Sequence, residues 1–397
     1  MHVAVVGAGI IGLLTAWQLT RQDHHVTVIA PEIGREASYA AAGMLAPISE
    51  VQYGQDRLWP LMTASRAEYP DLLAALAETT DAPTGYRENG TLLVAADRSD
   101  RDAVAELASV QQHHGMEVTA LTSSTWRRRE PSLAPGLAKA WDVPSDHQVD
   151  PRLLMRATVA ALTDAGAEFL TAHVNEVTAG GDGVQLRLSP ATPAGSDAAA
   201  DHSAPETHTA EKVLLAPGLG YSEIAGLPES TPLDLRPVHG EVLRLRVTET
   251  QRATGDDHIL QATVRAVVAG RSVYLVPRAD GGLVVGASSR EDSLTGTRTG
   301  AVQELLDDAV RVLPGIKETA LEEITTRARP GTPDDIPYLG RLADHDDVVV
   351  STGYSRHGIL LAPLAARLGA ALLTGTELSE DDRRMLDHMS PTRRPRG

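Results

Sequence analysis

The chain has 397 residues, a length that suggests two or three domains. Its composition, 42% hydrophobic and 22% charged, is that of a globular protein with a substantial core. A formal net charge of −17 gives no general attraction to nucleic acid or anionic lipid. The absence of cysteine excludes disulfides, thiolate nucleophiles, iron–sulfur clusters and a flavin attached through cysteine.

The first 30 residues predict a βαβ unit. Residues 3–6 form a short β-rich run, apolar residues continue at helical spacing to Leu19, and a second apolar run covers 25–30. The run before Leu19 lacks the basic segment and cleavage site of a signal peptide, and no later stretch has the ~20 uninterrupted apolar residues of a membrane helix. We expect a cytoplasmic protein with no membrane or nucleic-acid partner.

The turn of this unit carries the motif G-x-G-x-x-G at Gly7, Gly9 and Gly12. The first glycine permits the tight turn, the second lets a pyrophosphate approach the backbone, and the third lets helix and strand pack closely. The alternative interpretation of this motif is a glycine-rich turn that only packs the strand on the helix. A ribose-binding carboxylate is expected about 20 residues further on, at Glu32, which could equally be a solvated turn residue.

The middle of the chain alternates helices and strands. The expected elements are a helix over 57–79 that Pro60 and Pro70 break or kink, a strand over 90–96, a helix over 98–114, a helix that Asp150 and Pro151 open and Gly166 ends, and strands over 167–174, 184–188 and 211–218. The segment 189–210 is rich in Ala, Pro, Ser, Thr and His, which favours a mobile loop between two strands.

The last part is strand-rich at first. Alternation and glycine turns predict an antiparallel sheet from 236 to 290, a helix over 300–313, and a closing strand and helix over 347–353 and 358–375. The basic tail 383–397 is expected to be solvated.

These elements predict an α/β (α+β overall) fold of two interleaved domains, a Rossmann-like dinucleotide-binding domain and an antiparallel-sheet substrate domain. We assign segments 1–84, 145–231 and 325–382 to the first domain, 85–144 and 232–324 to the second, and 383–397 to the tail.

Four segments resemble signature segments of the D-amino-acid-oxidase family, and most closely those of its glycine oxidases of the thiamine pathway. They are SYAAAGMLAP at 38–47, YLVPRADGGLVVGAS at 274–288, RPGTPDDIPYLG at 329–340 and GYSRHGILLAP at 353–363. Each is modest alone, but they occur in register from Val3 to about Gly375, which makes the resemblance specific.

The resemblance implies non-covalent FAD and no metal. It places the ADP half on Gly7, Gly9, Ile10, Ile11 and Gly12, the pyrophosphate and ribityl region on Ala37 and Ser38, the flavin ring beside Ala42, Gly43 and Met44, and the adenine at Val174. It also implies that the ring is edged by Tyr354, Ser355, Arg356, His357, Gly358, Ile359 and Leu360, where a helix N-terminus stabilises the reduced flavin. The family's ribose-binding glutamate falls on Ala30, which leaves Glu32 as its substitute, and His357 stands where glycine oxidases often carry asparagine.

The resemblance further implies a substrate site. Arg329 matches the arginine that clamps the substrate carboxylate, Tyr274 the tyrosine that shares it, and Met44 a residue beside the flavin. Arg356 is expected to face the cavity and meet the carboxylate. The structural alternatives are a packed strand tyrosine at Tyr274, core filling at Met44 and a salt bridge at Arg356.

The function implied is FAD-dependent oxidation of glycine, sarcosine or small D-amino acids, with hydride transfer from Cα to flavin N5 and reduction of O₂ to hydrogen peroxide. The imine product would feed thiazole assembly with thiazole synthase downstream, and the family suggests a homotetramer. Alternatives are a D-amino-acid dehydrogenase or sarcosine-oxidase-like enzyme of the same family, and a non-catalytic FAD-binding subunit.

Overall fold

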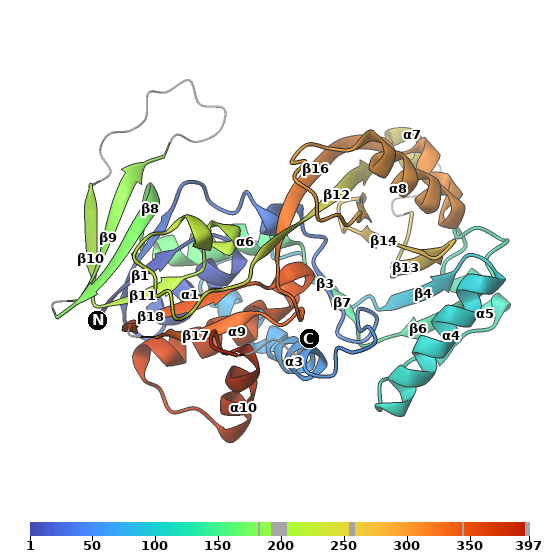
Figure 1. Cartoon of the computed structure of the whole chain (residues 1–397). Helices are drawn as coiled ribbons and strands as arrows, with labels where there is room; N and C mark the ends of the chain where they lie inside the picture. The colour runs from blue at the N-terminus through green and yellow to red at the C-terminus, as the bar shows by residue number, and fades with distance from the viewer. Residues whose placement is uncertain (182, 192–204, 254–258, 344, 394–397) are drawn as a thin grey trace.

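The protein consists of two lobes that lie side by side, each built on an eight-stranded sheet (Figure 1). The structure is a computed structural model, and it describes residues 1–397 except 182, 192–204, 254–258, 344 and 394–397.

The sheet of the first lobe has a parallel centre. In spatial order its strands are β10 (Thr207–Ala210), β9 (Gly183–Pro190), β8 (Glu168–Gly180), β2 (His25–Ala30), β1 (His2–Val6), β11 (Lys212–Leu215), β18 (His345–Thr352) and β17 (Tyr338–Leu342). The five strands from β8 to β18 pair in parallel, and β17, β9 and β10 add antiparallel edges. A parallel centre must be covered by helices, because its strands are apolar on both faces.

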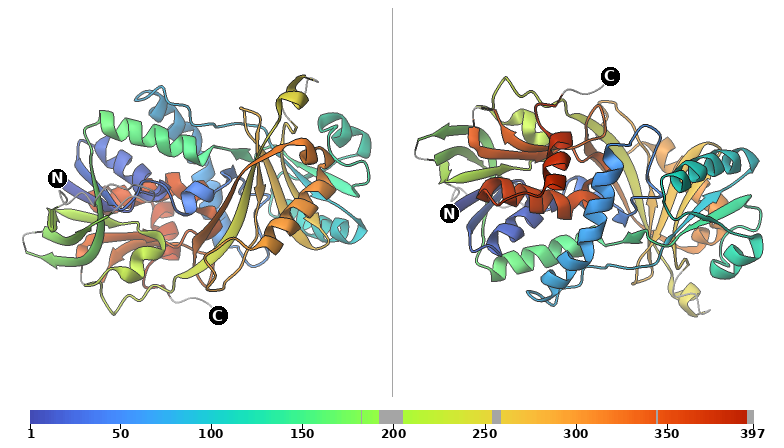
Figure 2. Two further views of the ribbon diagram at one scale, coloured as in Figure 1. Left: turned by 90° about the horizontal axis from the view of Figure 1, so that it is seen from above. Right: turned by 90° about the horizontal axis from the view of Figure 1, so that it is seen from below.

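Helices α1 (Ile10–Thr20), α3 (Leu58–Ala77), α6 (Pro151–Asp164) and α9 (Gly358–Thr374) supply this cover. The helix α9 packs against α1 and α3, and α6 packs against α1, as the two views in Figure 2 show. The start of α6 agrees with the prediction, since the Asp150 carboxylate accepts the N–H groups of Arg152 and Leu153.

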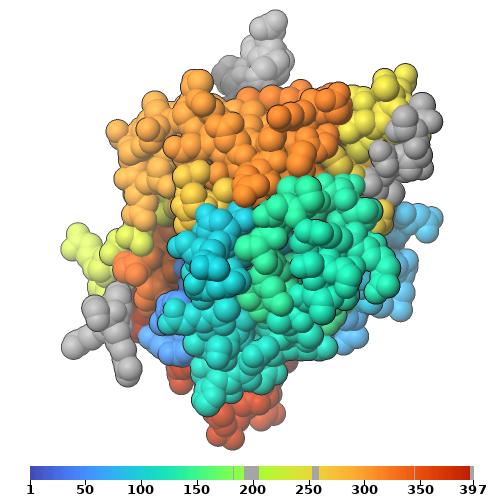
Figure 3. Space-filling model, turned by 90° about the vertical axis from the view of Figure 1, so that its right-hand side faces the viewer, coloured from blue at the N-terminus to red at the C-terminus, as the bar shows by residue number. Residues whose placement is uncertain are grey.

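The second lobe has a mostly antiparallel sheet. Its strands are, in spatial order, β16 (Ala320–Gly331), β12 (Arg236–Arg246), β15 (Gly282–Gly286), β14 (Arg271–Pro277), β13 (Thr263–Val268), β4 (Thr91–Ala95), β6 (Lys139–Val143) and β5 (Thr119–Ala120). The pair β13 and β4 is parallel and the other pairs are antiparallel. Helices α4 (Arg98–His113), α5 (Ser123–Arg129) and α8 (Thr299–Val312) lie on its outer side, the face seen in Figure 3.

The lobes exchange the chain several times. The first sheet takes strands from 2–30, 168–215 and 338–352, and the second from 91–143 and 236–331. A short two-stranded sheet of β3 (Met44–Leu45) and β7 (His147–Gln148) lies apart from both. The mixed fold with a dinucleotide-type sheet and an antiparallel sheet is confirmed, and the individual domain boundaries stay predictions.

Two segments differ from their prediction. The chain forms a single helix α3 across Pro70, so the helix is not broken there, and a kink stays a prediction. The predicted loop 189–210 is shorter than expected, because β9 continues to Pro190 and residues 207–210 form β10 on its edge. The central part of that loop, 192–204, lies outside the described residues.

The prediction of a solvated tail at 383–397 is wrong for residues 383–393. Helix α10 (Glu380–Met389) begins with a capping box of Ser379 and Asp382, and Met389 is buried. Arg393 then donates to the Asp334 carboxylate at 2.9 Å and lies over the Tyr338 ring. A charge-assisted contact and a stacked guanidinium therefore fix a segment whose composition alone suggests solvent exposure.

One helical stretch among the described residues, Ser355–Thr374, is long and apolar enough to span a membrane by length and composition. However, 78% of its apolar window is buried inside the protein, between α1 and α3. The stretch is therefore the central helix of the first lobe.

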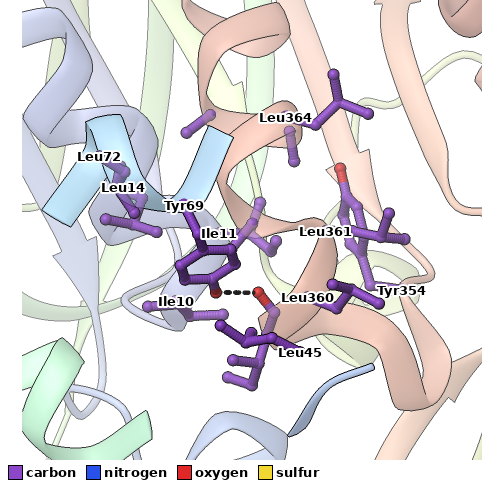
Figure 4. Close-up of a cluster of buried hydrophobic side chains, with 14 of the residues drawn as sticks. Ile10, Ile11, Leu14, Leu45, Tyr69, Leu72, Tyr354, Leu360, Leu361 and Leu364 are labelled. Carbon is purple, nitrogen blue, oxygen red and sulfur yellow. Dashed lines mark hydrogen bonds between the residues drawn. The ribbon is translucent and has the colours of Figure 1, made fainter. Parts of the chain in front are cut away.

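Helix α9 contains an internal proline whose backbone defect is repaired by α3. Pro363 has no N–H to give to the Ile359 carbonyl four residues earlier. The buried Tyr69 hydroxyl donates to that carbonyl at 2.5 Å (Figure 4), and Ser65 Oγ accepts the N–H of Leu364 at 3.2 Å. Two side chains one turn apart on α3 thus hold the N-terminal turn of α9 in place.

We expect Tyr69→Phe to destabilise the protein by about 1–3 kcal/mol, because the Ile359 carbonyl would stay buried without a donor. Pro363→Ala should be stabilising in the Tyr69→Phe background, since the restored N–H can reach that carbonyl. Chemical denaturation of the four variants of this cycle measures the coupling. Additive effects of the two substitutions would contradict the proposed repair.

Candidate functional site

The glycine turn after β1 admits no side chain at two of its three glycines. Gly7 has a φ of +104°, and a Cβ there would lie 2.3 Å from the Ala216 carbonyl oxygen. A Cβ at Gly12 would lie 2.0 Å from the Gly7 carbonyl oxygen. The turn is therefore as tight as a dinucleotide-binding loop requires.

The N-terminus of α1 offers free donors next to this turn. The N–H of Ile10 donates to Ser38 Oγ at 3.1 Å, which brings the predicted pyrophosphate residue Ser38, with Ala37 beside it, to the glycine loop. Among the described residues, the N–H groups of Ile11 and Gly12 have no protein acceptor. A phosphate at this helix end would find both donors and the positive end of the helix dipole.

The predicted ribose and adenine contacts lie at the ends of β2 and β8. Ala30 ends β2, and its neighbour in β8 is Thr171, three residues before the half-buried Val174. The Glu32 carboxylate accepts from Arg35 Nε at 3.0 Å and is partly exposed. Glu32 is thus near the predicted adenosine site but already holds an arginine.

The segment 39–43, predicted to approach the flavin ring, is held by three arginines through its carbonyl groups. Arg152 and Arg244 both donate to the Tyr39 carbonyl at 3.1 Å. Arg278 donates to the Ala42 carbonyl at 2.6 Å, and burial lowers the pKa of its guanidinium to about 10. The turn is therefore held from both lobes, by Arg152 of α6 in the first and by Arg244 and Arg278 in the second.

Gly43 completes this turn. It has a φ of +74°, and a Cβ there would lie 2.1 Å from the Val149 carbonyl oxygen. Met44 follows in β3 and packs in a small apolar cluster with Ala42 and Tyr274. The structure therefore brings the predicted flavin-ring residues and the predicted substrate tyrosine together.

Arg329 and Tyr274 lie over glycines of neighbouring strands. A Cβ at Gly240 of β12 would lie 2.4 Å from Arg329 Nη1, and a Cβ at Gly286 of β15 would lie 2.3 Å from the Tyr274 hydroxyl. The guanidinium makes one weak contact, a 3.4 Å donation to the Ser288 carbonyl. Burial raises the pKa of Tyr274 although Arg329 opposes it, so the phenol is neutral at pH 7.

The segment from Tyr354 to Leu360 forms one turn of 3₁₀ helix and the start of α9. Tyr354 is buried and its hydroxyl lies 2.8 Å from Ser351 Oγ, and Ser355 has a φ of +47°. Arg356 keeps an exposed surface, but the protein atoms around the rest of its side chain remove part of its water and so lower its pKa, against the attraction of Glu50. His357 is 1% exposed and accepts from Arg356 Nε at 3.2 Å.

The two predicted halves of the flavin site are neighbours in the first lobe. Ile10 and Ile11, at the start of α1, lie in the same buried cluster as Tyr354 and Leu360, which belong to the start of α9 (Figure 4). The glycine loop and the predicted ring-edging segment therefore face the same region.

Glu50 is a buried carboxylate that the sequence analysis missed. It is 7% exposed, forms an ion pair with Arg265 of β13, and its Oε2 lies 3.2 Å from His357 Nδ1. Burial would raise its pKa, but Arg265, the hydrogen bond from His357 and the charge of Arg356 lower it to about 2. Glu50 is therefore ionised at neutral pH.

The site holds more positive charge than the Glu50 carboxylate neutralises. Among the described residues, neither Arg329 nor Arg356 has a carboxylate within 4 Å, and Arg265 shares Glu50 with His357. The Arg329 charge opposes the rise that burial causes in the pKa of Tyr274 and contributes to the lowered pKa of Arg356, so these groups are close together. Such a group of arginines can bind a small carboxylate next to the segments predicted to hold the flavin.

Known proteins resemble this chain over nearly its full length. A family model described as "DAO: FAD dependent oxidoreductase" matches residues 2–372. The chain is 30% identical over 383 residues to the glycine oxidase of Geobacillus kaustophilus, covering 96% of this chain and 94% of that protein. The crystal structure of glycine oxidase from that organism superposes with a TM-score of 0.85 and 30% identity, covering 99% of this chain and 98% of the other.

Other relatives are longer. The chain is 30% identical over 377 residues to the "Bifunctional protein ThiO/ThiG" of Nostoc sp., covering 94% of this chain but 52% of that protein. It therefore spans about half the length of these bifunctional relatives.

Acid or heat should release the flavin of the purified yellow protein into solution. The glycine loop and α1 offer non-covalent contacts, and no cysteine is present for attachment. Absorbance of the supernatant after precipitation measures the release. Flavin that stays with the precipitate would show covalent attachment through another side chain.

If Glu32 holds the adenosine ribose, Glu32→Ala should weaken FAD binding by about 1.5–3 kcal/mol, the range for a hydrogen bond to a charged group. Arg35→Ala is the matched control, because it removes the other partner of the 3.0 Å ion pair and leaves the carboxylate in place. Titration of the apoprotein with FAD measures both. Unchanged affinity in Glu32→Ala would assign no ribose contact to this residue.

Proposed function

Since the chain belongs to the DAO family of FAD-dependent oxidoreductases, we propose that it oxidises glycine and other small amino acids, such as sarcosine and small D-amino acids. The observation that carries this proposal is the arrangement of Arg329, Tyr274 and Met44 beside the segment 39–43. The nearly full-length similarity to glycine oxidases supports it.

FAD, when bound, supplies the two-electron acceptor that takes the hydride from the substrate Cα at flavin N5. The residues of the chain then have to bind the carboxylate, orient Cα–H and keep the amine in its neutral form. A neutral amine needs no general base, which agrees with a site made of arginines and a tyrosine.

Arg329 is the proposed carboxylate clamp. Arg329 is half-buried, both terminal nitrogens of its guanidinium lie over Gly240, and its hydrogen bond to the Ser288 carbonyl is weak, so its donors are available for a two-pronged contact. The neutral Tyr274 hydroxyl can donate a further hydrogen bond to the same carboxylate. Arg356, close enough to interact electrostatically with Arg329, adds further positive charge.

Turnover balances as a two-electron oxidation. The amino acid loses a hydride from Cα and a proton from nitrogen to become an imine. Molecular oxygen takes the two electrons and two protons to give hydrogen peroxide. Water then converts the imine of glycine to glyoxylate and ammonia when no partner consumes it.

We further propose that the imine serves the thiazole part of thiamine biosynthesis, with thiazole synthase as the downstream partner. Support comes from relatives named ThiO/ThiG, in which a segment similar to this chain is joined to a second protein. We also propose a cytoplasmic location, as expected from the sequence, and a homotetramer, which rests on the family resemblance alone.

The proposal is tested by anaerobic bleaching of the flavin spectrum with a panel of small amines, followed by oxygen consumption and peroxide yield. Bleaching by glycine with stoichiometric peroxide supports an oxidase. Bleaching without oxygen consumption would indicate a dehydrogenase, and bound FAD that no amine bleaches would indicate a non-catalytic subunit.

Arg329→Ala should raise KM for glycine strongly and leave FAD binding and the flavin spectrum unchanged. Removing one partner of a shielded charge pair typically costs about 2–5 kcal/mol, or roughly thirty- to several-thousand-fold in kcat/KM. Arg329→Lys should recover part of the loss, because an ammonium lacks the two-pronged geometry.

An amine without a carboxylate is the matched control substrate, and its turnover should be indifferent to the substitution. If glycine turnover by Arg329→Ala stayed within twofold of the parent, the clamp would have to be reassigned, first to Arg356.

A further inference from the structure

We propose that Glu50 and His357 form a relay that orients the guanidinium of Arg356 toward the bound carboxylate, so that both are positioning residues of the site. The inference rests on the proposed function in taking the bound group to be a substrate carboxylate. It adds to that function a second arginine whose direction is set by the protein before the substrate binds.

The hydrogen-bond directions in the relay follow from chemistry. Arg356 Nε always carries a hydrogen, so His357 Nε2, at 3.2 Å, must accept. An imidazole that accepts at Nε2 is neutral and carries its proton on Nδ1. That nitrogen lies 3.2 Å from Glu50 Oε2 but makes no well-aligned hydrogen bond, so the negative carboxylate favours this tautomer by its charge.

The first member of the relay is fixed. Glu50 is buried and is ion-paired with Arg265, which lies in β13 directly opposite Tyr274 of β14. His357 is almost completely buried between Glu50 and Arg356. Two rigid groups therefore stand behind the guanidinium, one of them tied to the sheet of the second lobe.

The last member of the relay needs such support. Arg356 is exposed, and among the described residues its side chain has no carboxylate within 4 Å. Its hydrogen bond to His357 is the contact that directs it, while Arg265 and Arg329 repel it. A long side chain held in its binding direction loses less conformational entropy when a ligand arrives.

Two substitutions of His357 can separate the two halves of the relay. Asparagine carries its amide atoms where histidine has Nδ1, so it can keep the Glu50 contact but cannot reach Arg356 as Nε2 does. Glutamine carries its amide atoms where histidine has Nε2, so it can keep the contact with Arg356. The two substitutions therefore separate the two halves of the relay.

The test uses the FAD-loaded protein and two readouts, KM and kcat for glycine and the Kd of glycolate by calorimetry. Glycolate keeps the carboxylate of glycine and replaces the amine by a hydroxyl, so it reports binding without turnover. His357→Asn should raise Kd and KM about tenfold or more and change kcat less, and His357→Gln should have a smaller effect.

A double-mutant cycle with Arg356→Ala shows whether His357 acts through the arginine. In the Arg356→Ala background, His357→Asn should change the Kd of glycolate less than twofold, because no guanidinium remains to be oriented. An equal rise in both backgrounds, or a Kd within twofold of the parent in the native background, would overturn the relay.

The controls separate positioning from folding. Bound FAD per chain and the unfolding midpoint are measured for each variant, and His239→Asn, a change at another buried histidine, should leave glycolate binding unchanged. If His357→Asn fails to fold, His357→Gln in both backgrounds and Glu50→Gln carry the same test. A protein that oxidises no amino acid but shows this pattern with glycolate would lose the proposed function and keep the relay.

Discussion

One buried carboxylate, Glu50, links the two lobes. Glu50 Oε2 lies 3.2 Å from Nδ1 of His357, which stands between β18 and α9 of the first lobe. The same carboxylate forms an ion pair with Arg265 of the second lobe's sheet. A buried charge is costly unless its partners surround it, so any separation of the lobes would leave Glu50 or Arg265 uncompensated. The relative position of the flavin-edging segment and the substrate tyrosine therefore depends on this contact.

A second set of contacts also joins the two lobes next to the site. Arg244 and Arg278 belong to the second lobe, but they donate to carbonyls of the segment 39–43, next to the predicted flavin ring. Each guanidinium supplies donors that satisfy backbone groups which no strand or helix partner satisfies. The loop that should contact the cofactor is thus shaped by the lobe that should contact the substrate.

The sequence predicted the elements with strong local signals and missed contacts between distant segments. The cap at Asp150, the glycines of the first turn and the alternating strands after 236 each act within a few residues, and the structure contains the expected elements. Arg244 stands in the alternating run VLRLR, which resembles a solvent-facing strand edge, and Glu50 follows an irregular segment. Only the tertiary fold brings Arg265 to Glu50 or Asp334 to Arg393, so neither pair has a sequence pattern.

The substrate half of the site also depends on side chains that are missing. Arg329 and Tyr274 can lie flat on the sheet because Gly240 and Gly286 leave the space that a Cβ would fill at 2.4 and 2.3 Å. In a strand, glycine weakens packing and is usually unfavourable, so its presence here exchanges local stability for a close approach. A comparable loss occurs at Pro363, which cannot donate a backbone hydrogen bond within α9. The Tyr69 hydroxyl of α3 donates to the Ile359 carbonyl instead. The strand glycines and the helix proline thus lie at the two borders of the site. At the glycines, the side chains of Arg329 and Tyr274 occupy the space that a Cβ would fill. At the proline, the Tyr69 hydroxyl satisfies the carbonyl that has lost its helical N–H donor.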